Sequence, residues 1–245
     1  MTHLYLIRHG EAVANVEPII GGMLGDTGLT ALGVSQAEAL RDRLAATHEI
    51  AADVLIASTL PRARQTAEII APALGLPILF EDNVQELKVG EADGMHVGEF
   101  KAKFGLPNLR VQPFRPIAPG GESWPQFVLR VAETLESITR EYADKTIVVV
   151  CHGGVIDASF LYCFGMNTLA VPYAELRTHN TSITHWERGA RDDGTARWRL
   201  WGYNDDFHLR HIGHHDPIIW QDIPPAHDVA EEHSAVPLPS EEEEE

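Results

Sequence analysis

The stretch Leu4-Tyr5-Leu6-Ile7-Arg8-His9-Gly10-Glu11 decides the fold. Its four apolar residues form a run of the length expected for a buried strand, and charged and polar residues follow directly. In open α/β sheets, ligands bind beyond the carboxyl ends of the strands. We therefore predict a buried strand that ends at a functional loop, with Arg8 and His9 on that loop.

Two later segments repeat this arrangement. Thr146-Ile147-Val148-Val149-Val150-Cys151 is the most strand-like run of the chain, and His152 follows it directly. Residues 53–57 form another apolar run, which leads into a helix predicted over 60–74. Arg62 lies in the first turn of that helix, where the helix dipole disfavours a cation and favours an anion. We therefore expect a negatively charged group close to Arg62.

Further segments alternate between helix and strand periodicity. Helices are predicted over 30–47, near 96–104, over 124–142 and over 155–164, and strands over 77–80, 181–188 and 196–203. Strands that alternate with helices indicate an α/β sandwich around a largely parallel sheet. Residues 81–122 lack a steady period and are expected to be an excursion between regular elements.

The composition is typical of a soluble globular protein. A chain of 245 residues with 44% apolar residues can bury a full core. No apolar run approaches the roughly 20 residues that span a bilayer, and no leader-like segment precedes the first strand. We expect a cytoplasmic protein without membrane contact. Cys151 and Cys163 lie in apolar surroundings, which favours buried free thiols over a disulfide.

Charge is concentrated at the carboxyl end. Residues 210–245 contain ten acidic residues and one arginine, in a chain of net charge −17. Such a balance argues against nucleic acid or an anionic membrane as partner, because both bind clustered lysine and arginine. We predict one domain over 1–209 and an acidic, proline-containing extension over 210–245. The extension should be solvated and partly disordered from 224 onward, while residues 218–220 pack onto the body.

The three strand ends bring two histidines and two arginines to one edge of the sheet. Arginine binds phosphate through its planar set of donors. The two cations also disfavour the protonated form of His9, and only a neutral imidazole is a nitrogen nucleophile. The set Arg8, His9, Arg62 and His152 is therefore typical of a site that binds and attacks a phosphoryl group.

These residues resemble the histidine phosphatase superfamily, in the branch that contains cofactor-dependent phosphoglycerate mutase. The matching positions are Leu6 to Glu11, Asn15, Leu29-Thr30-x-x-Gly33, Ser58 to Ala67, Glu86, Gly120 to Ser123, Cys151 to Gly154 and Asn180 to Ile183. The resemblance covers residues 3–209, and its motifs occur in the family's order.

The resemblance implies a three-layer α/β/α sandwich around a largely parallel mixed sheet, in a monomer or homodimer. It implies that His9 becomes a phosphohistidine and that no metal or other cofactor is needed. The residues that contact phosphate or substrate would be Arg8, Asn15, Arg62, His152 and Gly153. Glu86 would protonate the leaving oxygen of a small phosphorylated substrate, with Glu91 and Asp93 as alternative proton donors.

Some positions depart from the mutase pattern. The chain has Ala12 and Ala14 where mutases carry a hydroxyl residue and a tryptophan, and Ile20-Gly21-Gly22-Met23 where they carry an aromatic segment. The apolar residues at 19–20 and 23–24 favour a phosphatase over a sugar-acid mutase and indicate a less polar substrate.

Other polar residues have two interpretations. Glu11 either binds substrate or accepts hydrogen bonds from its own loop. Glu122 and Ser123 are better explained as the start of a helix than as pocket residues. Residues 180–183 are expected to order the loop below His152. His211, His214, His215 and Asp216 suggest a metal site, but no second cluster supports it in the sequence, so a solvated stretch or an adventitious metal site is favoured.

Together these observations predict a metal-independent phosphatase that hydrolyses a phosphomonoester through His9. Two alternatives stay open. A phosphotransferase of the mutase type would use the same residues but protect its phosphoenzyme from water. A silent phosphate-binding module would need none of the catalytic set, whose completeness argues against it.

Overall fold

A mixed sheet of six strands forms the centre of the computed structural model, which describes residues 1–215 and 219–226. The strands are β1 (Thr2–Arg8), β2 (Val54–Ser58), β3 (Ile78–Glu81), β4 (Thr146–Cys151), β5 (Ile183–Ala190) and β6 (Ala196–Asp205). Their order is β3-β2-β4-β1-β5-β6. The first four strands in this order are parallel to one another. At the other edge, β5 pairs antiparallel with β1, and β6 pairs antiparallel with β5. The predicted mixed, largely parallel sheet is confirmed.

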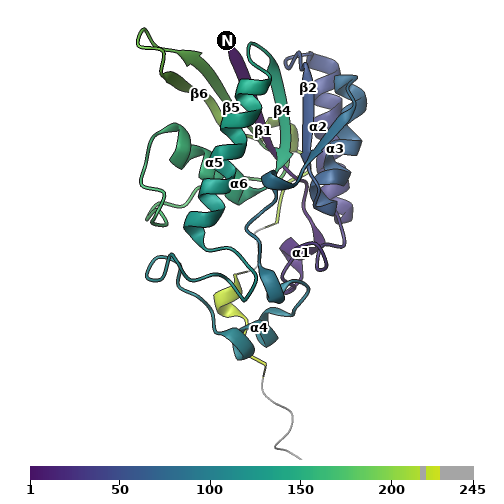
Figure 1. The fold of residues 1–245 in the computed structure, drawn as a ribbon. Helices are drawn as coiled ribbons and strands as arrows, with labels where there is room; N and C mark the ends of the chain where they lie inside the picture. Colours follow the sequence, from purple (N-terminus) through teal and green to yellow (C-terminus); the bar gives the residue numbers. More distant parts are fainter. Residues whose placement is uncertain (216–218, 227–245) are drawn as a thin grey trace, which may run out of the picture.

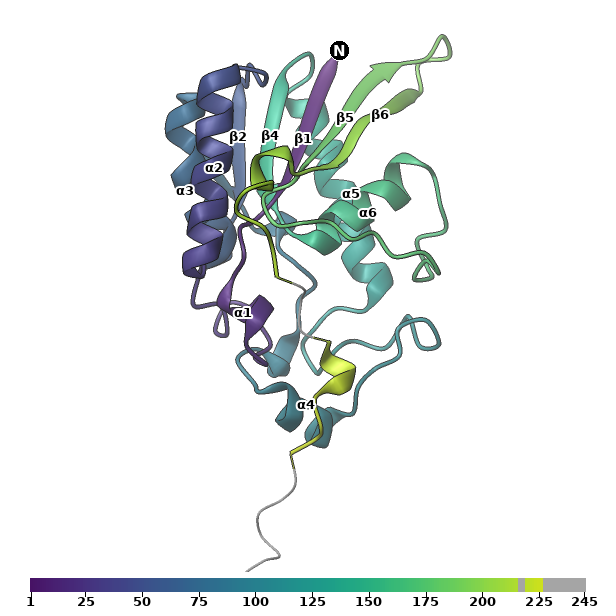
Figure 2. The same cartoon turned by 180° about the vertical axis from the view of Figure 1, so that it is seen from behind.

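Helices cover both faces of this sheet (Figures 1 and 2). The long helices are α2 (Ala31–Thr47), α3 (Pro61–Leu74), α5 (Trp124–Glu141) and α6 (Gly153–Cys163); α1 (Val13–Val16) and α4 (Val97–Phe104) are short. Helices α2 and α3 pack together on one face, and α5 and α6 pack together on the other. The predicted three-layer α/β/α sandwich is therefore confirmed.

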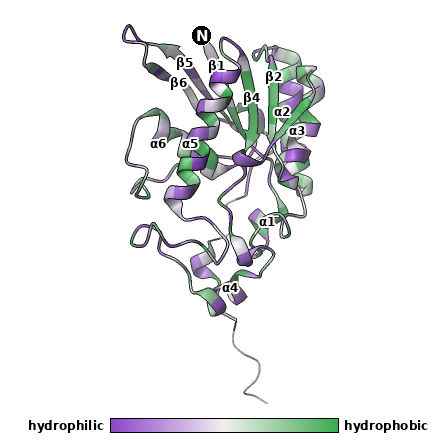
Figure 3. Cartoon of the chain, viewed as in Figure 1, coloured by the Kyte–Doolittle hydropathy of each residue, from purple (hydrophilic) through white to green (hydrophobic). Residues whose placement is uncertain are grey.

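Successive side chains of the central strands point to opposite faces of the sheet and so contribute to two separate hydrophobic cores. Ile147 and Val149 of β4 pack toward α5 and α6, whereas Val148 and Val150 pack toward α2 and α3. All four are fully buried, because β4 lies between two parallel strands and is covered on both faces. The apolar run that marked β4 in the sequence is a direct consequence, and Figure 3 shows the same strand as strongly hydrophobic.

The helix limits follow local signals closely. Thr30 caps α2, where its hydroxyl accepts the N–H of Gly33. Pro61 occupies the first turn of α3, where its missing N–H leaves no bond unmade. Helix α6 begins at Gly153, two residues earlier than predicted, directly after His152. Both cysteines are free thiols; Cys151 is buried and Cys163 is partly buried.

The excursion between β3 and α5 forms a small third core with α4 at its centre. Phe100 and Ile117 are buried there, and Trp220 packs against Phe100 with ring centroids 6.0 Å apart. Residues beyond Trp220 also contact α4, since the Ala226 N–H donates to the Gly98 carbonyl at 3.0 Å. Residues 224–226 are nevertheless exposed, in keeping with the prediction that the solvated extension begins at 224. Ile218 and the rest of the predicted extension, 227–245, lie outside the described residues.

Within residues 1–215 and 219–226, no helix combines the length and the hydropathy that crossing a membrane requires.

Candidate active site

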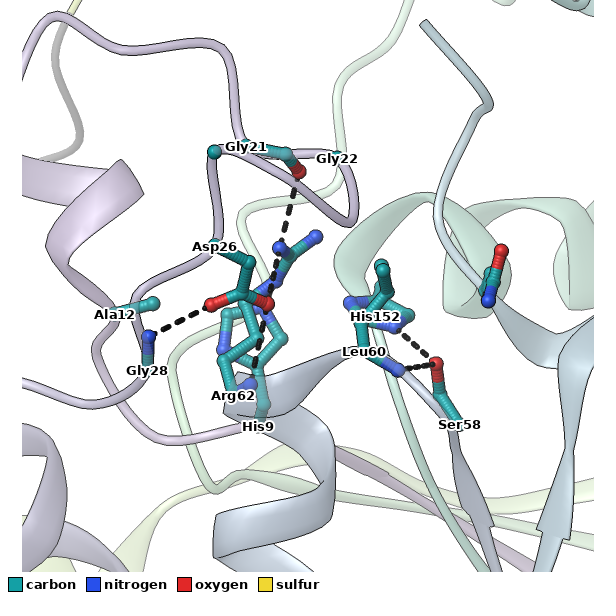
Figure 4. A network of polar contacts seen from close by, with 12 residues as sticks. His9, Ala12, Gly21, Gly22, Asp26, Gly28, Ser58, Leu60, Arg62 and His152 are labelled. Carbon is teal, nitrogen blue, oxygen red and sulfur yellow. Dashed lines mark hydrogen bonds and ion pairs between the residues drawn. The ribbon is translucent and has the colours of Figure 1, made fainter. Parts of the chain in front are cut away.

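The carboxyl ends of β1 and β4 bring two distant histidines together. Arg8 pairs with Cys151 in the parallel register, so the residues that follow both strands emerge side by side. The rings of His9 and His152 lie 5.1 Å apart between centroids, and both residues are buried. Arg62, from the first turn of α3, donates from Nε to His9 Nε2 at 3.1 Å. The expected convergence of the two imidazoles and Arg62 is present (Figure 4).

The hydrogen bonds of His9 define its tautomer. Nδ1 lies 2.6 Å from the carbonyl oxygen of Gly10, which can only accept, so Nδ1 carries the proton. Nε2 therefore keeps its lone pair, and this lone pair accepts the Arg62 N–H. The backbone carbonyl of His9 is fixed by the Asn180 amide at 2.9 Å. His9 is held with one unprotonated nitrogen toward Arg62.

Charge and burial keep this imidazole neutral. Burial is the main cause that lowers the pKa of His9 well below its usual value, and the nearby guanidiniums of Arg62 and Arg8 lower it further. The same causes lower the pKa of His152. Both rings are thus unprotonated near neutral pH, which is the state a nitrogen nucleophile needs.

Arg62 is itself held by a buried carboxylate that the sequence did not reveal. Asp26 accepts the backbone N–H of Arg62 at 3.1 Å and its Nη1 at 2.8 Å, and also the Gly28 N–H at 3.0 Å (Figure 4). Its side chain is fully buried. The anion expected near the start of α3 is therefore Asp26, a group of the protein itself. Its only sequence signal is the Gly25-Asp26-Thr27-Gly28 turn.

One cavity of about 400 Å³ joins the predicted residues. Its walls include Arg8, His9, Asn15, Arg62, Glu86 and Gly153. His152 lies behind His9, with Nε2 2.8 Å from the Ser58 hydroxyl. Two buried nitrogens, Arg8 Nε and His152 Nδ1, have no hydrogen-bond partner among the described residues. An unpaired buried donor such as the Arg8 N–H is costly, and the oxygens of a phosphate are suitable partners.

Glu86 lies against the amino end of α6. One carboxylate oxygen accepts the Gly154 N–H at 3.0 Å, and the other accepts the Leu87 N–H at 2.9 Å. This approach requires glycine at 154, because a Cβ there would lie 2.2 Å from the Glu86 carboxylate. The start of α6 thus fixes a carboxylate in the wall of the cavity that His9 lines.

The two alternative proton donors lie elsewhere. Asp93 accepts the N–H groups of Gly22, Leu24 and Gly25, and so holds the 20–25 loop closed. Glu91 is exposed and lies 3.7 Å from Lys103. Neither residue lines the cavity, which favours Glu86 among the three.

Asn15 and residues 180–183 support the first loop. Asn15 lines the cavity, and its side-chain oxygen accepts the Ala12 N–H at 3.0 Å. The Thr181 N–H donates to the Arg8 carbonyl at 2.9 Å. Residues 180–183 therefore order the ends of β1 around Arg8 and His9, not the loop below His152 as predicted.

Glu11, Glu122 and Ser123 have contacts within the protein. Glu11 is buried, accepts the Thr30 hydroxyl at 2.7 Å and lies 2.9 Å from His215 Nδ1. Ser123 is the N-cap residue of α5, as predicted, and Glu122 pairs with Arg130.

His211, His214 and His215 are exposed, as expected of a solvated stretch, but His214 lies beside further possible ligands that the sequence did not show. His214 stacks on His179 with ring centroids 4.1 Å apart, and His179 bonds Asp206 at 2.7 Å. The potential ligand atoms of these three residues lie within 4.8 Å of one another. A second group of possible ligands thus exists, contributed by segments distant in the sequence, while Asp216 lies outside the described residues.

Asp157 of α6 is a further acid that the sequence analysis missed. It lines a cavity together with Arg8 and Asn15. Burial and the nearby charge of Glu86 raise its pKa to about 7, although Arg8 opposes this shift. Asp157 is the only acidic residue within Gly153–Cys163, a signal that could have identified it.

Comparison with known proteins agrees with this geometry. The sequence pattern described as "Histidine phosphatase superfamily (branch 1)" matches residues 4–203. The chain belongs to this family. It is accordingly a histidine phosphatase by class, and the resemblance inferred from the motifs is confirmed.

Individual relatives carry both phosphatase and mutase names. A metal-independent phosphoserine phosphatase of Arabidopsis thaliana is 29% identical over 87% of this chain and 85% of its own length. A probable phosphoglycerate mutase of Escherichia coli, GpmB, is 34% identical over 75% of this chain and 84% of its own length. Among solved structures, a phosphoserine phosphatase variant from Entamoeba histolytica with bound phosphoserine aligns with a TM-score of 0.67 and 27% identity. That alignment covers 85% of this histidine phosphatase and all of the other chain.

The Asp26–Arg62 contact leads to a first prediction. Asp26→Asn should lower kcat/KM by about 10–100-fold, because a hydrogen bond to a charged group contributes about 1.5–3 kcal/mol. The inhibition constant of inorganic phosphate should rise in parallel, since Arg62 loses its orientation toward the anion. The exposed Asp42→Asn is the matched control. Unchanged phosphate affinity in a folded Asp26→Asn protein would show that Asp26 does not position Arg62.

Asp157 should control how substrate binding depends on pH. Its raised pKa of about 7 means that it is protonated in acid and becomes charged as the pH rises. The charged form lies near Arg8 and should repel a phosphate dianion, so KM should increase about three- to tenfold from pH 6 to 8.5. In Asp157→Asn this increase should disappear. The second ionisation of the substrate affects both proteins equally. If KM depended on pH in the same way in both proteins, Asp157 would not be the group responsible.

Proposed function

We propose that this enzyme hydrolyses a phosphomonoester through a phosphohistidine at His9, without a metal ion. The observation that carries the proposal is the unprotonated Nε2 of His9, which faces Arg62 in a cavity that Arg8 also lines. A nucleophile and two fixed cations are the parts that phosphoryl transfer requires.

In the first step, a substrate phosphate oxygen replaces His9 Nε2 as the acceptor of the Arg62 N–H. The released lone pair attacks phosphorus, an N–P bond forms, and the bond from phosphorus to the leaving oxygen breaks. Charge spreads over the three equatorial oxygens, where the guanidiniums of Arg8 and Arg62 stabilise it. Glu86, in its protonated form, gives a proton to the leaving oxygen, so the alcohol departs uncharged.

In the second step, water replaces the alcohol. Glu86, now ionised, takes a proton from this water as its oxygen attacks phosphorus and the N–P bond breaks. The products are inorganic phosphate and free His9, and Glu86 is protonated again. The positive charge that a metal ion supplies in other phosphatases comes here from the two arginines.

A direct test follows the phosphoenzyme. Rapid quenching with 4-nitrophenyl phosphate should trap one phosphoryl group per chain that is stable in base and lost in acid, as expected for phosphohistidine. Treatment with EDTA should leave turnover unchanged. Activity lost in chelator and restored by added divalent metal would contradict the metal-free scheme.

The mutase name of the E. coli relative supports phosphotransfer within one substrate as a second candidate. A mutase must keep its phosphoenzyme intact until the acceptor returns, whereas a phosphatase discharges it to water. Decay of the trapped phosphoenzyme at the rate of turnover, in the absence of any acceptor alcohol, would favour hydrolysis.

A further inference from the structure

A large apolar cavity lies beside the phosphate site. Its volume is about 840 Å³, and it is formed by the segment after α4, by α6 and by the loop that follows α6. The segment after α4 and the loop after α6 lie on the same side of the molecule in the two opposite views (Figures 1 and 2). The apolar walls include Leu106, Leu109, Phe160, Leu161, Val171 and Leu176. Ligand cavities of about 300–1,000 Å³ accommodate molecules much larger than phosphoserine.

This cavity shares wall residues with both cavities that contain the proposed catalytic residues. Leu109 and Trp124 line both the apolar cavity and the cavity that contains His9 and Glu86. Asp157 and Leu176 line both the apolar cavity and the one that contains Arg8. The apolar space is therefore close enough to His9 to receive the remaining part of a phosphate ester, past Trp124 or Asp157.

Charge in the cavity opposes a second anionic group on the substrate. Of the charged residues in its walls, Asp157 and Glu175 are acidic, and Arg110 already pairs with Glu175 at 3.0 Å. A carboxylate on the leaving group would find no unpaired cation among the described residues of these walls and would lie near the acid Asp157. An uncharged, apolar group would instead exchange water for hydrocarbon contacts.

The 19–20 segment adds apolar surface on the phosphate side. Ile19 and Ile20 line the cavity that contains His9, whereas Met23 and Leu24 are exposed and line neither cavity. The less polar substrate expected from residues 19–20 and 23–24 therefore depends on the isoleucines and on the large cavity.

We infer that the natural substrate is a phosphomonoester of a bulky, uncharged and mainly apolar alcohol, whose hydrocarbon part occupies this cavity. The inference rests on the proposed function, since the cavity is assigned through the wall residues that it shares with the phosphate site. It excludes small phosphorylated acids, such as phosphoserine and phosphoglycerate, as preferred substrates.

A series of n-alkyl phosphates tests the inference, because their leaving groups have nearly equal intrinsic reactivity. Each methylene that becomes buried should raise kcat/KM about two- to fourfold. Hexyl phosphate should therefore be hydrolysed at least about tenfold more efficiently than ethyl phosphate or phosphoserine. A flat series, or a preference for phosphoserine, would overturn the inference.

A pair of variants locates the effect in the cavity. Ala174 lines it, while the neighbouring Tyr173 does not and is 93% exposed. Ala174→Trp should reduce the ratio of hexyl to ethyl phosphate efficiency at least about tenfold, because the indole fills space that several methylenes would occupy. Tyr173→Trp adds an indole to the same loop and should leave the ratio within twofold of that of the unmodified enzyme. Equal ratios in both variants would place hydrocarbon binding elsewhere.

The outcomes also separate this inference from the proposed function. If 4-nitrophenyl phosphate and every alkyl ester remain unhydrolysed, the proposed function fails and the inference fails with it. If all esters are hydrolysed with dependence on His9 but without preference for chain length, the phosphatase function stands and the inference alone is wrong.

Discussion

His9→Ala is expected to lose turnover by at least about 10⁴-fold, the largest effect of any single substitution in this chain. The physical reason is that, among the described residues, His9 is the only histidine in the wall of the active-site cavity. His152 is the nearest other imidazole, but its Nε2 is already bonded to the Ser58 hydroxyl, and it does not line the cavity. Turnover of 4-nitrophenyl phosphate and trapping of the base-stable phosphoenzyme measure this loss together.

The control separates chemistry from folding. His211→Ala alters an exposed histidine outside the cavity and should retain full activity. The His9→Ala protein should still bind inorganic phosphate, because Arg8 and Arg62 remain, and its thermal unfolding should stay cooperative. Retained turnover in a folded His9→Ala protein would mean that a different nucleophile operates.

The placement of the site could be predicted because its signals are local. The apolar runs of β1, β2 and β4 mark largely buried strands, and the residue after a parallel strand lies at the ligand-binding edge. His9 and His152 follow this rule directly, and Arg62 lies in the first turn of the helix that follows β2, so their convergence could be expected without knowledge of long-range contacts. The same reasoning located helices α2 to α6 to within two residues, with Thr30 and Pro61 as start signals, but it did not predict the short helix α1.

Asp26 and Asp157 could not be placed in this way. Asp26 is 36 residues from Arg62, and its contact depends on how the loop before α2 folds back over α3. The pKa of Asp157 depends first on burial and then on Glu86, which belongs to another element. Such pairings depend on tertiary packing, and the sequence offers only weak cues to them: a turn for Asp26, and a lone acid on an apolar helix for Asp157.

The identity of the proton donor likewise depends on tertiary contacts that the local sequence does not show. The sequence left Glu86, Glu91 and Asp93 open, because all three lie within one irregular segment. Only the contacts distinguish them. Glu86 is fixed by Gly154 at the start of α6, Asp93 closes a loop, and Glu91 faces solvent near Lys103.

Glu86→Gln should have an effect that depends on the leaving group. With ethyl phosphate, turnover should fall by about 10²–10⁴-fold, because an alkoxide cannot leave without the proton that Glu86 supplies. With 4-nitrophenyl phosphate, whose phenolate is a stable leaving group, the loss in the first step should be less than about tenfold. A single-turnover measurement of alcohol release isolates this step from the later attack by water.

Glu91→Gln and Asp93→Asn are the matched substitutions, since each removes one carboxylate charge from the same segment. Glu91→Gln should leave both substrates unaffected, because its carboxylate is exposed and lies outside the cavity. Asp93→Asn should lower the free energy of unfolding by about 1–3 kcal/mol through the N–H groups it no longer satisfies, without a dependence on leaving group. Only a general acid couples the loss of rate to the basicity of the departing oxygen. An equal loss with both esters in Glu86→Gln would therefore assign Glu86 to binding, and the same selective loss in either control would identify that residue as the donor.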